Sequence, residues 1–227
     1  MPTKFLSIQG SYHHLEVALF EETSCLFSLV QEDSKASSHL IPILDKSLSK
    51  NNCTIKDISF ISVDMGPGAF TSLRVTIATV NGIAFNKKIP LVGINGLEAL
   101  TIQARQTDVI SRPVIALLNA YNHDVYFRFS FQNEIKEGWG NINNITKQLI
   151  TLTKNRESIF TGNGVEFYRH IIKEDFGKLA HIQEPLSLVA SAKTIGYCAY
   201  NLWQKGESGI FELTPHYLKT QYFAIKK

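Results

Sequence analysis

The sequence predicts an α/β protein of two lobes, each built on a mixed β-sheet flanked by helices. The chain has 227 residues, which is enough for one large domain or two small ones. Its first third reads as short strands joined by tight connections, and strands then alternate with helices. A polar stretch at 106–112 separates the halves, so we place an N-terminal lobe at 1–106 and a C-terminal lobe at 107–227.

The first lobe is expected to open with three antiparallel strands. These runs are rich in β-branched, aromatic and other apolar residues, and turn residues such as Gly10-Ser11 separate them. Helices and strands then alternate, and one strand is apolar enough to be buried on both faces. The expected elements are strands Lys4–Gln9, Leu15–Phe20, Cys25–Val30, Ile58–Val63 and Pro90–Ile94, and helices from near Ser37 through Leu48, Thr71–Phe85 and Gly96–Arg105.

The second lobe restarts with strands on either side of a turn at 119–122. Both lobes therefore open in the same way, which suggests an ancestral duplication, although the sequence contains no aligned internal repeat. The expected elements are strands Arg112–Leu118, Val125–Phe131 and Ser158–Thr161, and helices Asn144–Thr153, Val165–Ile172 and Val189–Lys205.

Composition and charge exclude several classes of protein. Apolar residues make up 44% of the chain and charged residues 19%, as in ordinary globular proteins. The net charge of +3 divides into −1 for residues 1–104 and +4 for residues 105–227, too weak for a dedicated nucleic-acid binder. The longest uncharged run, Val75–Asn86, is shorter than the roughly 18–20 residues of a membrane span, and the start lacks a signal peptide's apolar stretch.

Metal ligation and nucleophilic catalysis have no recognisable motif here. Cys25, Cys53 and Cys198 lie far apart without a CxxC pair, which favours a reducing cytoplasm. The seven histidines include no HExxH or HxxxH pair, and no GxSxG nucleophile motif is present. We therefore expect a cytoplasmic protein with no metal site and no catalytic residues.

A glycine-containing loop joins the buried strand to the next helix. Gly66 and Gly68 permit backbone conformations that other residues avoid, and Thr71 or Ser72 is available to cap the helix. Free N–H groups at a helix start can bind phosphate, so these four residues form a candidate phosphate-binding loop. The alternative is a turn that needs glycine at two positions, and spacing alone favours that alternative. No Gly-Lys-Ser/Thr follows, which excludes a P-loop.

Two helices of the first lobe combine into a candidate interaction surface. Between Thr71 and Phe85 the only charged residue is Arg74, so this helix is expected to be buried, either in its own lobe or against a partner. With the preceding helix it would form an apolar surface that pairs with another chain, and the pattern favours neither alternative. The residues assigned to this surface are Leu40, Ile41, Leu44, Leu48, Leu73, Ile77, Val80 and Ala84.

Several of these segments resemble bacterial TsaB (YeaZ) proteins. Residues 66–74 (GPGAFTSLR) are similar to that family's GPG-S-[FY]-T-G-[LV]-R stretch, and 82–100 follows its G-L-A, I-P-L-V-G-V and S-L-E-A-L segments. Ser38–Pro42 resembles its first-helix start, Asp124–Tyr126 its E-V-Y strand and Pro215–Lys219 its C-terminal P-x-Y-L-R. The resemblance therefore reaches both halves of the chain.

The resemblance implies an actin-like ATPase (ASKHA) fold and a non-catalytic role in making threonylcarbamoyladenosine in tRNA beside the anticodon. It implies that the chain pairs with a catalytic TsaD-like paralogue through the two first-lobe helices, a surface that can also pair two copies. A TsaE-like ATPase would join them, and tRNA would be contacted only indirectly. No cofactor is expected on this chain alone, and ATP or ADP would bind, if anywhere, at the partner interface.

The sequence departs from the family pattern at three places. Gln9 stands where an aspartate of the phosphate motif is usual, Ser72 replaces glycine, and Asn119-Ala120-Tyr121 replaces D-A-R. Because glutamine is a poor ligand for hard cations, these departures argue against ATP hydrolysis by this chain. The alternative is a nucleotide-dependent enzyme of the same fold, such as a small kinase or glycoprotease-like protein, with Asp64 as metal ligand. A third hypothesis is a homodimer that acts outside tRNA modification.

Overall fold

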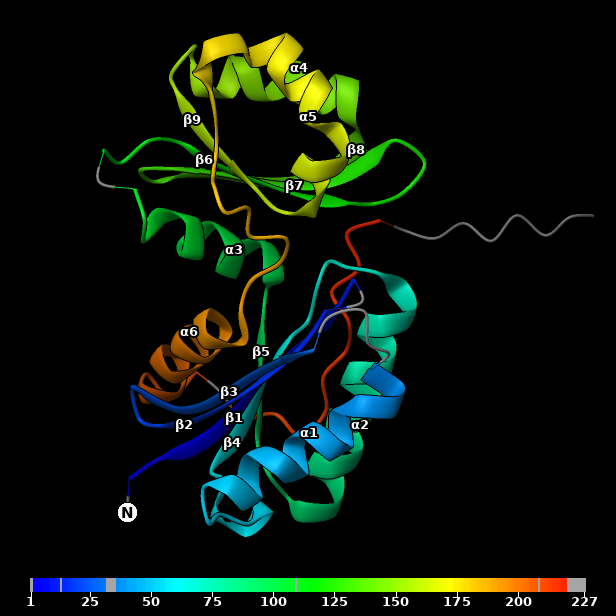
Figure 1. Cartoon of the computed structure of the whole chain (residues 1–227), viewed down its shortest axis with the longest axis vertical. Helices are drawn as coiled ribbons and strands as arrows, with labels where there is room; N and C mark the ends of the chain where they lie inside the picture. The colour runs from blue at the N-terminus through cyan, green and yellow to red at the C-terminus, as the bar shows by residue number, and fades with distance from the viewer. Residues whose placement is uncertain (1, 13, 32–35, 109, 208, 220–227) are drawn as a thin grey trace, which may run out of the picture.

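The structure, a computed structural model, describes residues 2–12, 14–31, 36–108, 110–207 and 209–219. Two five-stranded sheets lie in separate lobes, one above the other in Figure 1, and helices cover their faces. The predicted α/β class with two mixed sheets is confirmed. No helix within the described ranges is long and apolar enough to cross a membrane.

The first sheet has the strand order β3-β2-β1-β4-β5. The strands β1 (Lys4–Ser11), β2 (His14–Glu21) and β3 (Ser24–Gln31) form the predicted antiparallel meander. The strands β4 (Phe60–Asp64) and β5 (Leu91–Ile94) follow, and both run in parallel with β1. Every residue of β4 is buried, because helices lie on both faces of the sheet.

Two helices, α1 (Ala36–Lys50) and α2 (Phe70–Lys87), lie together on one face of this sheet, and a 3₁₀ turn, Ile55–Asp57, precedes β4. The prediction that Thr71 or Ser72 is the N-cap of α2 is wrong. The N-cap is Ala69, whose side chain makes no capping hydrogen bond, so both hydroxyl residues lie within the first turn of α2.

The second sheet has the strand order β10-β9-β6-β7-β8 and carries two strands that the sequence analysis did not predict. One is polar and glycine-containing and lies at the sheet edge, and the other has only three residues, so neither has a strong strand pattern. The elements are β6 (Val114–Asn119), β7 (Asp124–Phe131), β8 (Glu134–Asn141), α4 (Ile142–Thr153), β9 (Ser158–Thr161), α5 (Asn163–Phe176), the 3₁₀ turn Gly177–Leu179 and β10 (Ala180–Ile182).

Each lobe repeats one element order: three strands, helix, strand, helix, strand, helix. The third helix of each repeat crosses over. Helix α3 (Gly96–Arg105) packs against the second sheet, and α6 (Ala192–Gln204) packs against the first (Figure 1). The duplication suggested by the sequence is therefore present in the topology.

The crossover corrects the predicted lobe boundaries. We assigned 107–227 to the C-terminal lobe, but α6 lies on the first sheet, with Ile195 and Ala199 in the same apolar cluster as Phe5 and Phe20. The Trp203 ring stacks on Phe60, with ring centroids 4.6 Å apart. Burial of these aromatic surfaces holds the returning helix on the first lobe.

Candidate functional site

The glycine loop is packed tightly between β4 and α2. Gly66 has a φ of +96°, and a Cβ added there would lie 2.6 Å from Cδ2 of Leu73, so only glycine fits this turn. The backbone N–H of His216 donates to the carbonyl of Met65 at 2.8 Å, so the C-terminal part of the chain lies over the loop. Of the four predicted loop residues, Gly66 is buried, Gly68 and Ser72 are half-buried and Thr71 is exposed.

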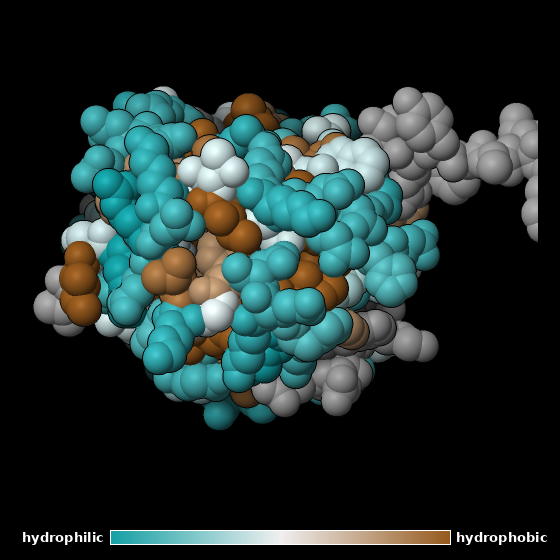
Figure 2. All heavy atoms as spheres, turned by 90° about the horizontal axis from the view of Figure 1, so that it is seen from above, coloured by the Kyte–Doolittle hydropathy of each residue, from teal (hydrophilic) through white to brown (hydrophobic). Residues whose placement is uncertain are grey.

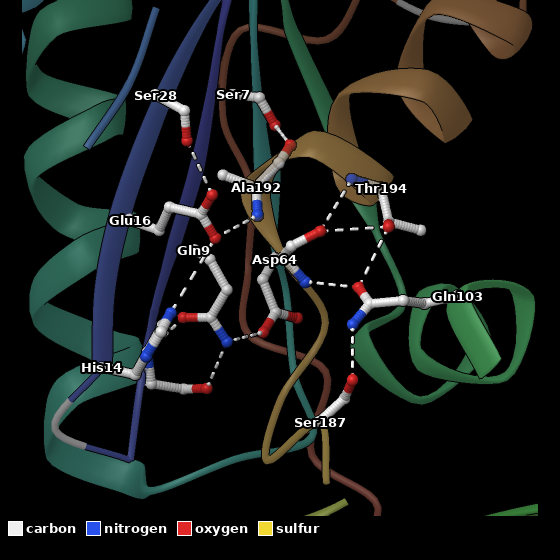
Figure 3. Close-up of polar contacts among 12 residues, drawn as sticks. Ser7, Gln9, His14, Glu16, Ser28, Asp64, Gln103, Ser187, Ala192 and Thr194 are labelled. Carbon is white, nitrogen blue, oxygen red and sulfur yellow. Dashed lines mark hydrogen bonds and ion pairs between the residues drawn. The ribbon is translucent and has the colours of Figure 1, made fainter. Parts of the chain in front are cut away.

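Asp64 lies at the end of β4 with both carboxylate oxygens engaged, and Figure 3 shows its contact with Gln9. Its Oδ1 accepts the N–H of Gly66 at 2.7 Å, and its Oδ2 accepts from the Gln9 amide nitrogen at 3.1 Å. Gln9 is itself fixed, because its amide nitrogen donates to Ser11 Oγ and its oxygen accepts the Ser11 N–H, each at 2.9 Å. Burial raises the pKa of Asp64 to about 6, offset in part by hydrogen bonds from Gly66 and Ser11.

Two hairpins meet where the lobes face each other. Tyr12, between β1 and β2, donates its hydroxyl to the carbonyl of Asn119, at the end of β6, at 2.7 Å. Burial and then the neighbouring Tyr126 raise the pKa of Tyr12 well above its ordinary value, so its hydroxyl remains a donor. A cavity of about 350 Å³ lies beside this contact and is lined by Tyr12, His14, Asn119, Tyr121, Asn163, Glu166, Phe167, Leu188 and Val189.

A buried carboxylate anchors the returning helix α6 to the first sheet (Figure 3). Glu16 accepts the N–H of Ala192 at 2.8 Å and the Ser28 hydroxyl at 2.9 Å, while Ser7 donates to the carbonyl of Ala192 at 2.7 Å. Burial raises the pKa of Glu16, but hydrogen bonds from His14, Ala192 and Ser28 outweigh it and leave the pKa below its ordinary value. The sequence analysis missed this anchor because its partners are distant along the chain.

The residues predicted for a partner surface are mostly inside the first lobe. Only Ile41 is exposed, at 53%. The prediction for the other side chains needs correction: their stripes on α1 and α2 face the first sheet and each other, so they form the lobe's own core. These buried residues, none more than 9% exposed, are Leu40, Leu44, Leu48, Leu73, Ile77, Val80 and Ala84.

The outer side of the same helix pair carries a different apolar surface. Phe85 of α2 is 85% exposed, and Ile41 of α1 borders a groove of about 400 Å³ between the helices. We call this groove the α1–α2 groove; Phe85 is not among the residues that line it. The sequence contained a signal for the exposed Phe85, since it is apolar but lies off the main stripe of α2. The groove is lined by Ile41, Leu44, Asp45, Leu48, Ile55, Thr79, Gly82, Ile83, Asn86 and Lys87.

The corresponding helices of the second lobe present a different surface. Figure 2, seen from above, shows a mainly hydrophilic face on which apolar residues form small separate groups. Among the large apolar side chains of α4 and α5, Phe167 is the strongly exposed one within the described residues, at 58%. Among those same residues, no group of three or more His, Cys, Asp or Glu could hold a metal ion.

The duplicated lobes, with crossing third helices and facing hairpins, define the actin-like ATPase fold. Solved structures with this architecture include YeaZ from Pseudomonas aeruginosa, with a TM-score of 0.74 at 22% identity over 95% of this chain and 100% of that one. Component A of the Acidaminococcus fermentans (R)-2-hydroxyglutaryl-CoA dehydratase has a TM-score of 0.53 at 10% identity, over 90% of this chain and 99% of that one.

Sequence comparison gives the family. The family described as "TsaD: tRNA N6-adenosine threonylcarbamoyltransferase" matches residues 32–225, so the chain belongs to it, in its TsaB (YeaZ) group. The TsaB protein of Buchnera aphidicola (Schizaphis graminum) is 28% identical over 54% of this chain and 58% of its own length. The Escherichia coli TsaB protein is 24% identical over 55% of this chain and 53% of its own length. The chain thus spans little more than half the length of these curated relatives.

One structural neighbour, a dehydratase activator from Clostridium difficile with a TM-score of 0.51 at 8% identity, is described with bound ADPNP. On this chain, the residues at the ends of β1 and β4 are poorly suited to bind a hard cation. Gln9 offers a neutral amide, and the nearby carboxylate of Asp64 is buried and already bonded to that amide and to the chain.

Proposed function

We propose that this chain is a non-catalytic partner subunit in the threonylcarbamoyladenosine modification of tRNA. Family membership and the names of the TsaB relatives support a place in this modification. The engaged Asp64 and the neutral Gln9 support a binding role over an enzymatic one. The partner would be a TsaD-like paralogue, with a TsaE-like ATPase joining the pair and tRNA contacted only indirectly.

The observation that carries the proposal is the α1–α2 groove. Ile41, 53% exposed at the groove, and Phe85, 85% exposed elsewhere on α2, cost hydration free energy in an isolated chain. A partner that covers these side chains would recover that free energy. Asp45 and Lys87 lie at the groove and can make polar contacts around an apolar centre. Two copies of the chain could use the same surface.

Pairing should be tested by co-purification with the TsaD-like protein of the same organism. We expect Ile41→Asp to weaken pairing at least about a hundredfold, because a charge would replace an apolar side chain of the groove that the partner covers. Phe167→Asp is the matched control, since this exposed phenylalanine lies on the second lobe. Normal pairing by Ile41→Asp, or an equal loss in both variants, would contradict the assignment of the groove.

The non-catalytic part of the proposal has its own test. We expect isothermal titration of the purified chain with ATP and Mg²⁺ to give no binding in the micromolar range and no turnover. Micromolar binding with hydrolysis would favour the nucleotide-dependent enzyme instead. Sedimentation of the chain alone would separate a homodimer, which Ile41→Asp should dissociate, from a monomer that pairs only with the paralogue.

A further inference from the structure

The C-terminal segment Leu213–Lys219, which we call the C-terminal strap, runs from the first lobe to the second. In Figure 1 it is the red trace that rises beside the first sheet toward the second lobe. It includes the Pro215–Lys219 motif noted in the sequence, and the proposed partner role gives that motif no task. Its contacts with both lobes indicate a role of its own.

Two sets of contacts hold the strap on the first lobe. The N–H of Leu213 donates to Oδ1 of Asn81 at 3.0 Å, and the Asn81 amide nitrogen donates to the carbonyl of Leu213 at 2.9 Å. The Leu213 side chain is buried in the core of that lobe. Further along, Nε of Arg74 donates to the Tyr217 hydroxyl at 2.9 Å, and the Tyr217 ring lies 5.6 Å from that of Phe70.

An ion pair of Lys219 and a contact of His216 with a carboxylate attach the same strap to the second lobe. Nζ of Lys219 donates to Oδ2 of Asp124 at 2.7 Å and to the carbonyl of Ala120 at 3.3 Å, both at the β6–β7 turn. Nε2 of His216 lies 3.3 Å from Oε1 of Glu137 on β8. Hydrogen bonds to a carboxylate are stronger than those between neutral groups, so these contacts resist separation of the strap from the second lobe.

Glu137 connects the strap to further structure between the lobes. Its carboxylate accepts from the Asn95 amide nitrogen at 3.0 and 3.1 Å, and from Arg128 of β7 at 2.7 Å. Asn95 is also the N-cap of α3, the helix that crosses from the first lobe to the second sheet. The strap, the crossing helix and the second sheet therefore meet at one partly buried carboxylate.

The strap also covers the glycine loop. The His216 N–H donates to the carbonyl of Met65, and a Cβ on Gly66 would lie 3.4 Å from the carbonyl oxygen of His216. The residue that pairs with Glu137 in the second lobe thus lies directly against the loop of the first. Movement of the strap away from the second lobe would disturb the cover of the loop at the same residue.

We propose that the C-terminal strap is a latch between the lobes. While Lys219 and His216 hold the second lobe, the two lobes keep one relative orientation and residues 65–69 are shielded. When those two contacts are released, the lobes can open and the loop becomes accessible. This goes beyond the proposed partner role and does not depend on it.

Hydrogen exchange measured by mass spectrometry on the full chain tests the latch. We expect the double variant His216→Leu, Lys219→Met to exchange amides 65–70 and 120–124 about tenfold faster, because two charge-assisted contacts are lost. Exchange in β9, remote from the strap, should stay unchanged. Arg169→Met is the matched control, since it removes an ion pair with Glu184 that does not join the lobes.

Two results would overturn the latch. One is unchanged exchange at 65–70 in the double variant, and the other is an equal rise in β9, which indicates general destabilisation. If the double variant does not fold, the same hydrogen-exchange measurement on Lys219→Met tests the latch. This single variant leaves every first-lobe contact of the strap intact. The exchanged pair Lys219→Asp with Asp124→Lys should restore at least part of the protection that Lys219→Met loses.

Discussion

The two lobes share one topology but expose different chemistry. The first lobe places Ile41 and Phe85 outward on α1 and α2, whereas the corresponding α4 and α5 expose mainly polar residues around Phe167. The net charges differ as well, −1 for residues 1–104 and +4 for residues 105–227. A duplicated fold can thus keep its core pattern while only one copy retains an apolar outer surface, because outward positions are not constrained by packing.

The largest predicted effect on stability concerns two glycines at corresponding places in the two lobes, Gly66 after β4 and Gly162 after β9. A Cβ on Gly162 would lie 2.1 Å from the backbone oxygen of Leu117, whereas at Gly66 the nearest atom is the tip of the Leu73 side chain. Both glycines have positive φ, so both alanine variants are strained. We expect Gly162→Ala to cost about 4 kcal/mol and Gly66→Ala about 2 kcal/mol.

Urea unfolding followed by circular dichroism measures both values. Gly82→Ala is the control, since a Cβ there meets nothing within 4 Å in the interior of α2, and it should stabilise the chain by about 0.5–1 kcal/mol. A greater loss of stability for Gly66→Ala than for Gly162→Ala would contradict the prediction. It would mean that the backbone contact at Gly162 is relieved more easily than the side-chain contact at Gly66.

A second prediction concerns the charge at the end of β4, where β9 ends in the uncharged Thr161. Folding raises the pKa of Asp64 from 3.8 to about 6, so the folded state binds the proton more tightly. Its contribution to stability is therefore complete below about pH 4 and is lost as the pH rises to about 6. The free energy of unfolding should therefore change by at most about 3 kcal/mol over this pH range.

Asp64→Asn should remove this pH dependence. The measurement is the free energy of unfolding of both proteins at several pH values from 3.5 to 8, roughly the range around the two pKa values. The difference between them, rather than either curve alone, isolates Asp64 from the other carboxylates. Parallel curves across this range would contradict the raised pKa.

The smallest predicted effect compares the two crossing helices. Glu16 accepts the Ala192 N–H at the start of α6, and Asn95 caps α3 by accepting the N–H groups of Leu97 and Glu98. We expect Glu16→Gln to cost about 2 kcal/mol, since a buried charged acceptor is lost, and Asn95→Ala about 1 kcal/mol. Thermal unfolding at pH 7 gives both values, and a reversed order would show that α3 is the more firmly anchored helix.

The regular part of the fold could be predicted from local pattern. Strong apolar runs gave the β1–β2–β3 meander, and α3 begins and ends where its spacing predicted, at Gly96–Arg105. The polar edge strand β8 could not be found, because Glu134–Asn141 has neither an apolar run nor a clean alternation. The outer residue Phe85 was missed because periodicity identifies the buried stripe of a helix, not the exposed side.

By itself the sequence determined the α/β class, the order of most elements and the family, since these depend on local spacing and on short motifs. Only the tertiary structure decided that the apolar stripes of α1 and α2 face inward, that α6 returns to the first sheet, and that the strap joins both lobes. The physical reason is that burial and hydrogen bonding in these cases link residues far apart in the chain, such as Glu16 with Ala192 and Lys219 with Asp124. Local periodicity carries no information about such pairs.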